Sequence, residues 1–350
     1  MTPARPLRVG VVGVGSLGFH HARILSGLPG LAMAGIHDER PERAAEVAAQ
    51  LKVPLHATLD ALLDACDAVV VAVPTTAHER VAIAALERGV GVLVEKPIAP
   101  TLEAADRILA AARRSGAVVQ IGHVERFNSA VLAAEPYLDA PLFVEVHRLA
   151  PFSPRSTDVA VVLDLMIHDV DLVQSLVGTP VREIAAVGVP VLTPTADIAN
   201  ARLVFESGAV ANLTASRISL EKMRKIRIFQ RSGYLSLNLA DGTGEFLRLR
   251  GELPMHGGEG PAGWFKGALD LAKIVERIPI KGDGTEPLRR ELESFRDAAL
   301  GEALPAVSGE DGRAALAVIL EIQARIQRTA EESWAPAGRS GGAAARSADL

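Results

Sequence analysis

A glycine-rich turn between a hydrophobic strand and an amphipathic helix is the feature that most constrains how this chain can fold. The turn reads Gly13-Val14-Gly15-Ser16-Leu17-Gly18, which fits the pattern G-x-G-x-x-G. The apolar run before it suits a buried parallel strand, and the segment after it has helical periodicity. In this context Gly13 permits a tight turn, Gly15 lets a pyrophosphate approach the backbone, and Gly18 lets helix and strand pack closely. Since the N-terminus of a helix binds phosphate, the segment predicts a dinucleotide site.

Strand and helix patterns alternate through the first third of the chain. Segments of these lengths demand right-handed crossovers between parallel strands. We therefore predict an α/β fold with a Rossmann domain at residues 1–122, built as a doubly wound parallel sheet. The expected strands are residues 8–13, 31–37, 68–73, 91–94 and 117–121, and the expected helices are residues 17–28, 41–51, 76–88 and 101–115.

The pattern changes at about residue 123, and residues 123–335 are predicted to form a second, α+β domain. Short strands joined by tight turns between residues 184 and 238 favour an open, mostly antiparallel sheet with helices on one face. Residues 251–285 are rich in Gly and Pro and suggest a long functional loop or interface segment, and the tail, residues 336–350, is expected to be disordered. The other expected elements are a strand at 142–149 and helices at 128–138, 159–176, 287–300 and 309–329, the last two closing this domain.

Asp38 identifies the preferred dinucleotide. It lies at the end of the second expected strand, twenty residues beyond Gly18. An acidic side chain there accepts hydrogen bonds from the adenosine ribose and repels a 2′-phosphate, which favours NAD. Arg40 weakens this preference because an arginine can pair with such a phosphate. The sequence therefore predicts NAD, with NADP less favoured.

Further cofactor contacts are expected from the carboxyl ends of later strands, where ligands bind in such sheets. Pro74, Thr75 and His78 follow one of these strands, and Glu95 and Lys96 follow the next. His78 could equally cap its helix.

Composition and charge exclude several classes of partner. The formal net charge is −5 at pH 7, so no overall positive field exists to hold nucleic acid. Cys66 is the only cysteine, which excludes an intramolecular disulfide and a cysteine-based zinc site, and a small buried side chain is favoured over a catalytic thiol. No apolar run approaches the roughly 20 residues of a membrane helix, and the first eight residues lack the apolar segment of a signal peptide. We therefore expect a soluble, cytoplasmic protein.

Several motifs together resemble the Gfo/Idh/MocA family of oxidoreductases, over about residues 6–330. They are the glycine turn, Val73-Pro74-Thr75-Thr76, Glu95-Lys96-Pro97, residues 122–128 (Gly-His-Val-Glu-Arg-Phe-Asn) and Asp164-Leu165-Met166-Ile167-His168. In that family a lysine and a histidine flank the nicotinamide and the reacting carbinol. The resemblance therefore implies an oxidoreductase acting on a CH–OH group, with catalytic Lys96 and His168, and with Asp164 holding the substrate or the histidine.

The spacing of Asp164 and His168 supports the same assignment. They are four residues apart, so on a helix they share one face. A carboxylate beside the imidazole would orient the ring and raise its basicity, as a general base requires. Lys96 could stabilise alkoxide charge, and Lys96 and His168 could exchange these two roles. Asp171 lies on the same face and is expected to be a hydrogen-bonding support rather than a metal ligand, because nicotinamide chemistry needs no metal here.

Residues 122–128 and 167–171 most resemble family members that act on nucleotide sugars. The resemblance implies oxidation of the 3-hydroxyl of UDP-N-acetylglucosamine to a 3-keto sugar nucleotide for lipid A or surface polysaccharide synthesis. A diphosphate needs local positive charge, and the candidates beside the expected crevice are Arg126 and Arg155, with Asn128 as a further substrate contact. The basic run at residues 222–227 is another candidate, although a solvated sheet edge is its favoured interpretation.

Two other functions stay open. One is an NAD(P)-dependent dehydrogenase of a free polyol or cyclitol such as inositol, which would need no diphosphate-binding arginines. The other is a non-catalytic, dinucleotide-binding sensor, which would gain nothing from a placed lysine–histidine pair. In each case the uncovered face of the second sheet and the family resemblance imply a homodimer or homotetramer.

Overall fold

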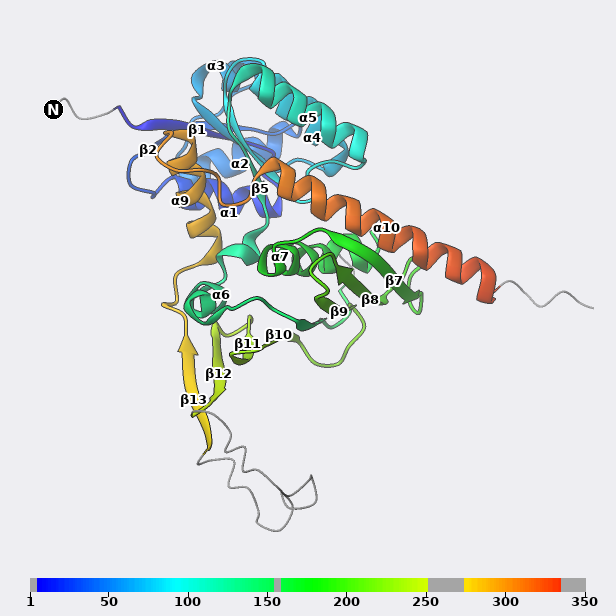
Figure 1. Cartoon of the computed structure of the whole chain (residues 1–350). Coiled ribbons are helices and arrows are strands. Elements are labelled where there is room, and N and C mark those ends of the chain that lie inside the picture. The colour runs from blue at the N-terminus through cyan, green and yellow to red at the C-terminus, as the bar shows by residue number, and fades with distance from the viewer. Residues whose placement is uncertain (1–4, 154–158, 251–273, 335–350) are drawn as a thin grey trace, which may run out of the picture.

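The computed structural model describes residues 5–153, 159–250 and 274–334, and these form two sheets with their own helices (Figure 1). The N-terminal sheet is parallel and the C-terminal sheet is mostly antiparallel, which confirms the predicted α/β class. Arg155 and the tail at residues 336–350, for which predictions were made, lie outside the described residues.

The N-terminal sheet has five parallel strands in the order β2-β1-β3-β4-β5. Its central strands are buried on both faces, as the run Ala-Val-Val-Val of β3 requires. Cys66 follows a helix that the sequence did not predict, α3 (Leu59–Ala65), and is buried; burial raises the pKa of its thiol to about 12, which agrees with a packing role. The other elements are β1 (Leu7–Val12), α1 (Ser16–Leu25), β2 (Leu31–His37), α2 (Pro41–Leu51), β3 (Ala68–Val71), α4 (Thr75–Leu86), β4 (Gly91–Glu95), α5 (Leu102–Ser115) and β5 (Val119–Gly122).

Within the described ranges the C-terminal sheet has eight strands in the order β13-β12-β11-β10-β6-β9-β8-β7, and among these only the β6–β9 pair is parallel. The basic run lies largely on β10, an inner strand between β6 and β11, so the interpretation as a sheet edge is wrong. Part of the expected loop at residues 251–285 forms β13, whose Pro279 is tolerated because β13 is an edge strand. The strands are β6 (Phe143–Leu149), β7 (Val181–Val189), β8 (Ile198–Phe205), β9 (Val210–Ser216), β10 (Met223–Gln230), β11 (Gly233–Asn238), β12 (Thr243–Leu249) and β13 (Val275–Lys281).

Two segments that were expected to be single helices are divided. The first, expected at residues 128–138, divides into α6 (Ser129–Ala134) and η2 (Glu135–Tyr137), because Pro136 opens a tighter turn. A separate turn, η1 (Val124–Phe127), precedes it, and Asn128 caps α6. The second begins with a π-helical turn, η3 (Val162–Met166), before α7 (Ile167–Val177). The π turn carries Asp164, which belongs to the site described below.

The last two helices join the two sheets instead of closing the second domain alone. In α9 (Pro287–Ala299), Leu292 and Phe295 are buried in the same cluster as residues of β1, β2 and α1. In α10 (Gly309–Trp334), Leu316 packs in a core of the parallel sheet and Ile319 packs in the core of the second. Figure 1 shows α10 running past both layers. The chain therefore returns to the Rossmann layer after building the second sheet.

The face of the second sheet opposite its helices carries mainly polar pairs, with an aromatic group at one end. Asn200 donates to Thr214 and Arg202 donates to Asn212 across β8 and β9. The aromatic group consists of Phe143, Phe229 and Tyr234. Within the described ranges, no helix is both long enough and apolar enough to cross a membrane.

Candidate active site

The glycine turn has the geometry that dinucleotide binding requires. Gly13 has a φ of +82°, and a Cβ there would lie 2.7 Å from the Ala72 carbonyl oxygen. A Cβ on Gly18 would lie 1.8 Å from the Gly13 carbonyl oxygen, so only glycine lets α1 approach this closely. A Cβ on Gly15 would meet only the Arg40 guanidinium, at 3.8 Å, and α1 begins after Gly15 without a side-chain cap. The first backbone N–H groups of α1 are therefore free to bind an anion.

A cavity of about 1100 Å³ lies in front of this turn and is lined by both domains. A volume of this order accommodates a dinucleotide cofactor together with a small substrate. Its lining residues from the first domain include Gly13, Gly15, Ser16, Leu17, Asp38, Arg40, Pro74, Thr76, Glu95, Lys96 and Gly122, and those that follow in the chain include Arg148, Asp164, Leu165, His168, Arg224 and Leu288.

Asp38 lies at the cavity as an ionised carboxylate. Its Oδ2 accepts the backbone N–H of Val14 at 2.8 Å, and its Oδ1 accepts the backbone and side chain of Arg40 at 2.9 and 3.1 Å. Burial alone would raise the pKa of Asp38, but these hydrogen bonds outweigh it and lower the pKa. The carboxylate is thus in the form that accepts hydroxyl hydrogen bonds and repels a phosphate.

His78 and Thr75 differ from the expected cofactor contacts. His78 is 1% exposed, and its ring nitrogens lie 2.9 Å from the carbonyl oxygen of Pro97 and 3.0 Å from that of Val73. It therefore links two strand ends behind the cavity, and the prediction that it contacts the cofactor is not supported. Thr75 is also absent from the cavity wall, which Pro74 and Thr76 form.

Lys96 is held by the second domain. Its Nζ donates to the backbone carbonyl oxygen of Asp164 at 2.9 Å and lies 3.8 Å from the Asp164 Oδ1. Burial lowers the pKa of the Lys96 ammonium, and Arg148 adds to this effect, while Asp164 and Glu95 oppose it. The amine thus loses its proton more readily than an exposed lysine.

His168 lines the cavity, but its surroundings differ from those expected. No hydrogen bond joins it to Asp164 within the described residues, and its buried Nδ1 has no partner there. The N–H of Ile167 bonds back five residues to Val162, which makes this turn π-helical. Asp164 and His168 both line the cavity, but the Asp164 carboxylate lies beside Lys96, with Oδ1 3.8 Å from Nζ, and not beside His168. Burial lowers the pKa of His168 well below its usual value, and Lys96, Arg148, His123 and Arg224 lower it further. The prediction that Asp164 raises the basicity of His168 is therefore wrong.

Two arginines of the cavity wall differ from the predictions. Arg148 was not predicted to belong to the site, and Arg224 belongs to the basic run that was interpreted as a solvated sheet edge. Arg148 of β6 donates to Asp169 at 2.8 and 2.7 Å and to Glu125 at 2.9 Å. Arg224 of β10 lies 3.5 Å from Glu125, and its side chain is 41% exposed. The signal for Arg148 was its place on the buried side of β6, in register with Val144 and Val146, where a strand rarely carries a charge without a function or partner.

The expected substrate contacts Arg126 and Asn128 lie away from the cavity wall. Arg126 forms a two-pronged ion pair with Asp171 at 2.8 and 3.0 Å, and it donates to Ser175 at 2.6 Å. Asn128 caps α6 and donates to Glu125 and to the Leu239 carbonyl oxygen. Both residues are thus engaged in packing, and Asp171 has the supporting role that was predicted for it.

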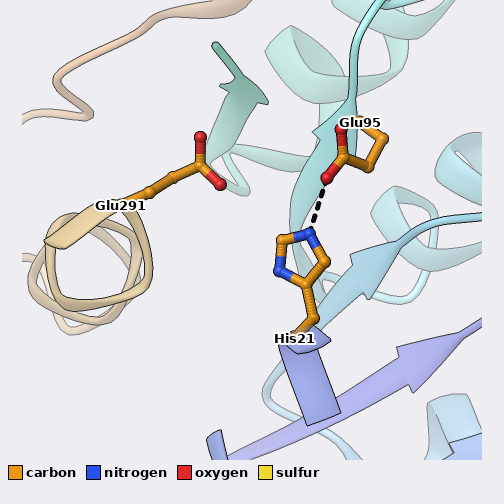
Figure 2. A group of neighbouring side chains, drawn as sticks. All are labelled: His21, Glu95 and Glu291. Atoms are coloured by element: carbon orange, nitrogen blue, oxygen red, sulfur yellow. Dashed lines mark hydrogen bonds and ion pairs between the residues drawn. The ribbon is translucent and has the colours of Figure 1, made fainter. Parts of the chain in front are cut away.

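Glu95 contacts a buried group behind the cavity. Figure 2 shows its carboxylate beside His21, with Glu291 facing both. This trio is the one set of side chains in the described residues whose ligand atoms lie close enough, within 4.8 Å, to suggest a metal.

Comparisons with known proteins agree with this architecture. Residues 7–123 match the family model of oxidoreductases with an NAD-binding Rossmann fold (GFO/IDH/MocA), and residues 113–236 match the GFO/IDH/MocA C-terminal domain. A UDP-N-acetylglucosamine 3-dehydrogenase of Acidithiobacillus ferrooxidans is 38% identical over 92% of this chain and 97% of its own length. A solved structure of that enzyme aligns with a TM-score of 0.82 and 36% identity, over 92% of this chain and 98% of the other.

The curated inositol dehydrogenases match a smaller share of the sequence. The inositol 2-dehydrogenase 2 of Saccharopolyspora erythraea is 35% identical over 49% of this chain and 54% of its own length. A probable dehydrogenase from Thermotoga maritima aligns with a TM-score of 0.75 at 22% identity, which shows the fold alone.

Arg126→Ala tests the reassignment of Arg126 to packing. It leaves the Asp171 carboxylate, 1% exposed, without its partner, so we expect the free energy of unfolding in urea to fall by about 3–5 kcal/mol. The control is Arg182→Ala, which removes an exposed pair with Glu183 and should cost at most about 1 kcal/mol. A stable Arg126→Ala protein that binds UDP much more weakly would contradict the reassignment.

Proposed function

The chain belongs to the Gfo/Idh/MocA family of oxidoreductases, and from that premise we propose that it oxidises the 3-hydroxyl of UDP-N-acetylglucosamine with NAD. The observation that carries the proposal is the cavity, in which the glycine turn, Lys96 and His168 meet. The similarity to a UDP-N-acetylglucosamine 3-dehydrogenase over nearly its whole length supports the substrate. The similarity to inositol dehydrogenases covers about half of the first of these, so a free cyclitol is the weaker candidate.

The first domain has the groups that hold a nicotinamide dinucleotide. The turn at Gly13 and the free N–H groups of α1 suit the pyrophosphate, and the Asp38 carboxylate suits the ribose hydroxyls. When bound, the dinucleotide supplies the acceptor for hydride. A 2′-phosphate would meet the Asp38 charge, and this supports NAD over NADP.

Lys96 is the proton acceptor in this proposal, and His168 orients the alcohol. Oxidation breaks the C3–H bond, whose electron pair leaves as hydride, and the O–H bond, whose proton goes to the Lys96 amine; the product is a ketone. A general base works best when its pKa lies near the working pH. Burial moves the pKa of Lys96 down toward that range and moves the pKa of His168 further below it. A neutral His168 can still hydrogen-bond the hydroxyl group.

Arg224 is the candidate for the substrate diphosphate. Arg148 uses its guanidinium on Asp169 and Glu125 and is 4% exposed, so it has little capacity for a ligand. Arg224 is far more exposed, and its contact with Glu125 is long at 3.5 Å, so it can turn toward an anion in the cavity. A sensor without turnover would have no use for the neighbouring lysine and histidine. The homodimer or homotetramer, the cytoplasmic location and the role in lipid A or polysaccharide synthesis stay predictions.

Arg224→Ala tests the substrate class. We expect the KM for UDP-N-acetylglucosamine to rise about tenfold or more, because a charge-assisted contact is lost, with NADH formation followed at 340 nm. The matched control is Arg227→Ala, on the same strand but paired with Glu145 outside the cavity, and it should leave KM unchanged. Faster turnover of inositol than of the UDP-sugar, or an unchanged KM for Arg224→Ala, would contradict the proposal.

Asp38→Ser tests the choice of dinucleotide. Removing the carboxylate also frees Arg40, so the ratio of kcat/KM for NADP to that for NAD should rise about tenfold or more. Glu46→Ser, which removes a surface carboxylate paired with Arg43, is the control. If the Asp38→Ser ratio equals that of the control, Asp38 does not select the cofactor.

A further inference from the structure

Three buried side chains from distant parts of the sequence meet behind the catalytic lysine. His21 comes from α1, Glu95 from the end of β4 and Glu291 from α9, and each is at most 8% exposed (Figure 2). The carboxyl group of Glu291 points toward the other two. The mechanism proposed above uses none of the three as a reacting group.

Both carboxylate oxygens of Glu95 have hydrogen-bond partners, whereas the carboxyl oxygens of Glu291 have none in the described residues. The Glu95 Oε1 lies 2.6 Å from the His21 Nε2, and its Oε2 accepts the backbone N–H of Lys96 at 3.2 Å. Within the described residues, neither carboxyl oxygen of Glu291 has a hydrogen-bond partner, and the His21 Nδ1 has none either. An ionised carboxylate without partners in such a place costs many kilocalories per mole, so a buried acid there keeps its proton.

The charges around Glu291 favour the same protonation state. The neighbouring elements present His21 from α1, Glu95 from β4 and the uncharged Gln120 from β5, whose amide donates to the Glu291 backbone carbonyl oxygen. On α9 itself, Arg289 and Arg290 pair with Glu293 and Asp283. Burial and the charge of Glu95 raise the pKa of Glu291 well above its usual value.

The distances favour a shared proton over a metal ion. Zinc bonds to nitrogen and oxygen are about 2.0–2.2 Å long, so two ligands at right angles lie at least about 2.8 Å apart. The His21 Nε2 and the Glu95 Oε1 are closer than this, at 2.6 Å, which is a charge-assisted hydrogen bond. Glu291 then completes the group as a neutral acid that can donate to Glu95 or His21 after a small movement.

We propose that Glu291 is a positioning residue for Lys96. The neutral carboxyl group of Glu291 completes a hydrogen-bonded cluster with His21 and Glu95, and this cluster fixes the backbone that carries the lysine. This inference rests on the proposed function for the role of Lys96. Glu95 is the link, because its carboxylate holds the Lys96 N–H and packs against Gly122, where a Cβ would lie 3.1 Å from Oε2. Since α9 also brings Leu288 to the cavity wall, the cluster joins the returning helix to the active-site strand.

Two substitutions that keep the size of the side chain test whether the cluster needs a hydrogen-bond donor at position 291 or only a side chain that fills the space. Glu291→Gln keeps a neutral donor and should hold kcat within about twofold, whereas Glu291→Met fills the space without a donor and should lower kcat about tenfold. NAD affinity should stay unchanged in both, because the glycine turn is untouched. Glu293→Gln, on the exposed side of α9, is the matched control. Equal kcat values for the Gln and Met variants, both folded, would overturn the proposal.

A second measurement does not depend on the substrate. An acid with a raised native pKa retains its proton on folding, so above pH 4.5 rising pH favours unfolding of the wild type, by up to about tenfold per pH unit in the equilibrium constant. Glu291→Gln lacks this group, so its melting temperature should exceed that of the wild type by a margin that grows between pH 5 and pH 8. A difference in melting temperature that stays constant with pH would overturn the inference, even if the protein turns over UDP-N-acetylglucosamine. One equivalent of bound zinc or manganese in the purified wild type would overturn it as well. Growth of the margin in a protein inactive on every UDP-sugar would instead reject the proposed function alone.

Discussion

The contact between the Lys96 Nζ and Asp164 is the interaction on which the rest of the site depends. Lys96 follows β4 of the parallel sheet, and Asp164 lies in the π turn that covers the second sheet. Because this single contact spans the two domains, it sets the position of the proton acceptor relative to the cofactor turn. It also explains why the cavity wall draws residues from both domains.

Burial and positive charge together set the chemistry of the cavity. Lys96, Arg148 and Arg224 surround His168, and they make its protonated form unfavourable. The carboxylates that balance these cations, Asp169 and Glu125, are buried beneath them and hydrogen-bonded to Arg148. A site of this kind attracts an anionic substrate, disfavours the protonated form of His168 and lowers the pKa of Lys96 through burial.

The sequence predicted the features that depend on residues close together in the chain. It did not predict those that depend on contacts between residues far apart in the chain. The roles of Gly13 and Gly18 follow from backbone geometry within a few residues, and the position of Asp38 follows from the same turn. The expected pairing of Asp164 with His168 was wrong because Asp164 lies beside Lys96, 68 residues away in the sequence. Arg126 was assigned to the substrate because it lies beside the expected crevice; its partner, Asp171, is 45 residues away, so the sequence pattern did not reveal the ion pair. The return of α9 to the first sheet was likewise invisible, since its apolar face fits either domain.

The rate of NADH formation in a single turnover of Lys96→Arg with UDP-N-acetylglucosamine tests the central claim most directly. Arginine keeps the positive charge but cannot lose its proton at working pH. If Lys96 accepts the proton, the rate should be about 10²-fold or more below that of the wild type, with unchanged NAD affinity and no rise in rate toward alkaline pH. A rate within a few-fold of the wild type, with the same pH dependence, would contradict the assignment of Lys96 as the proton acceptor.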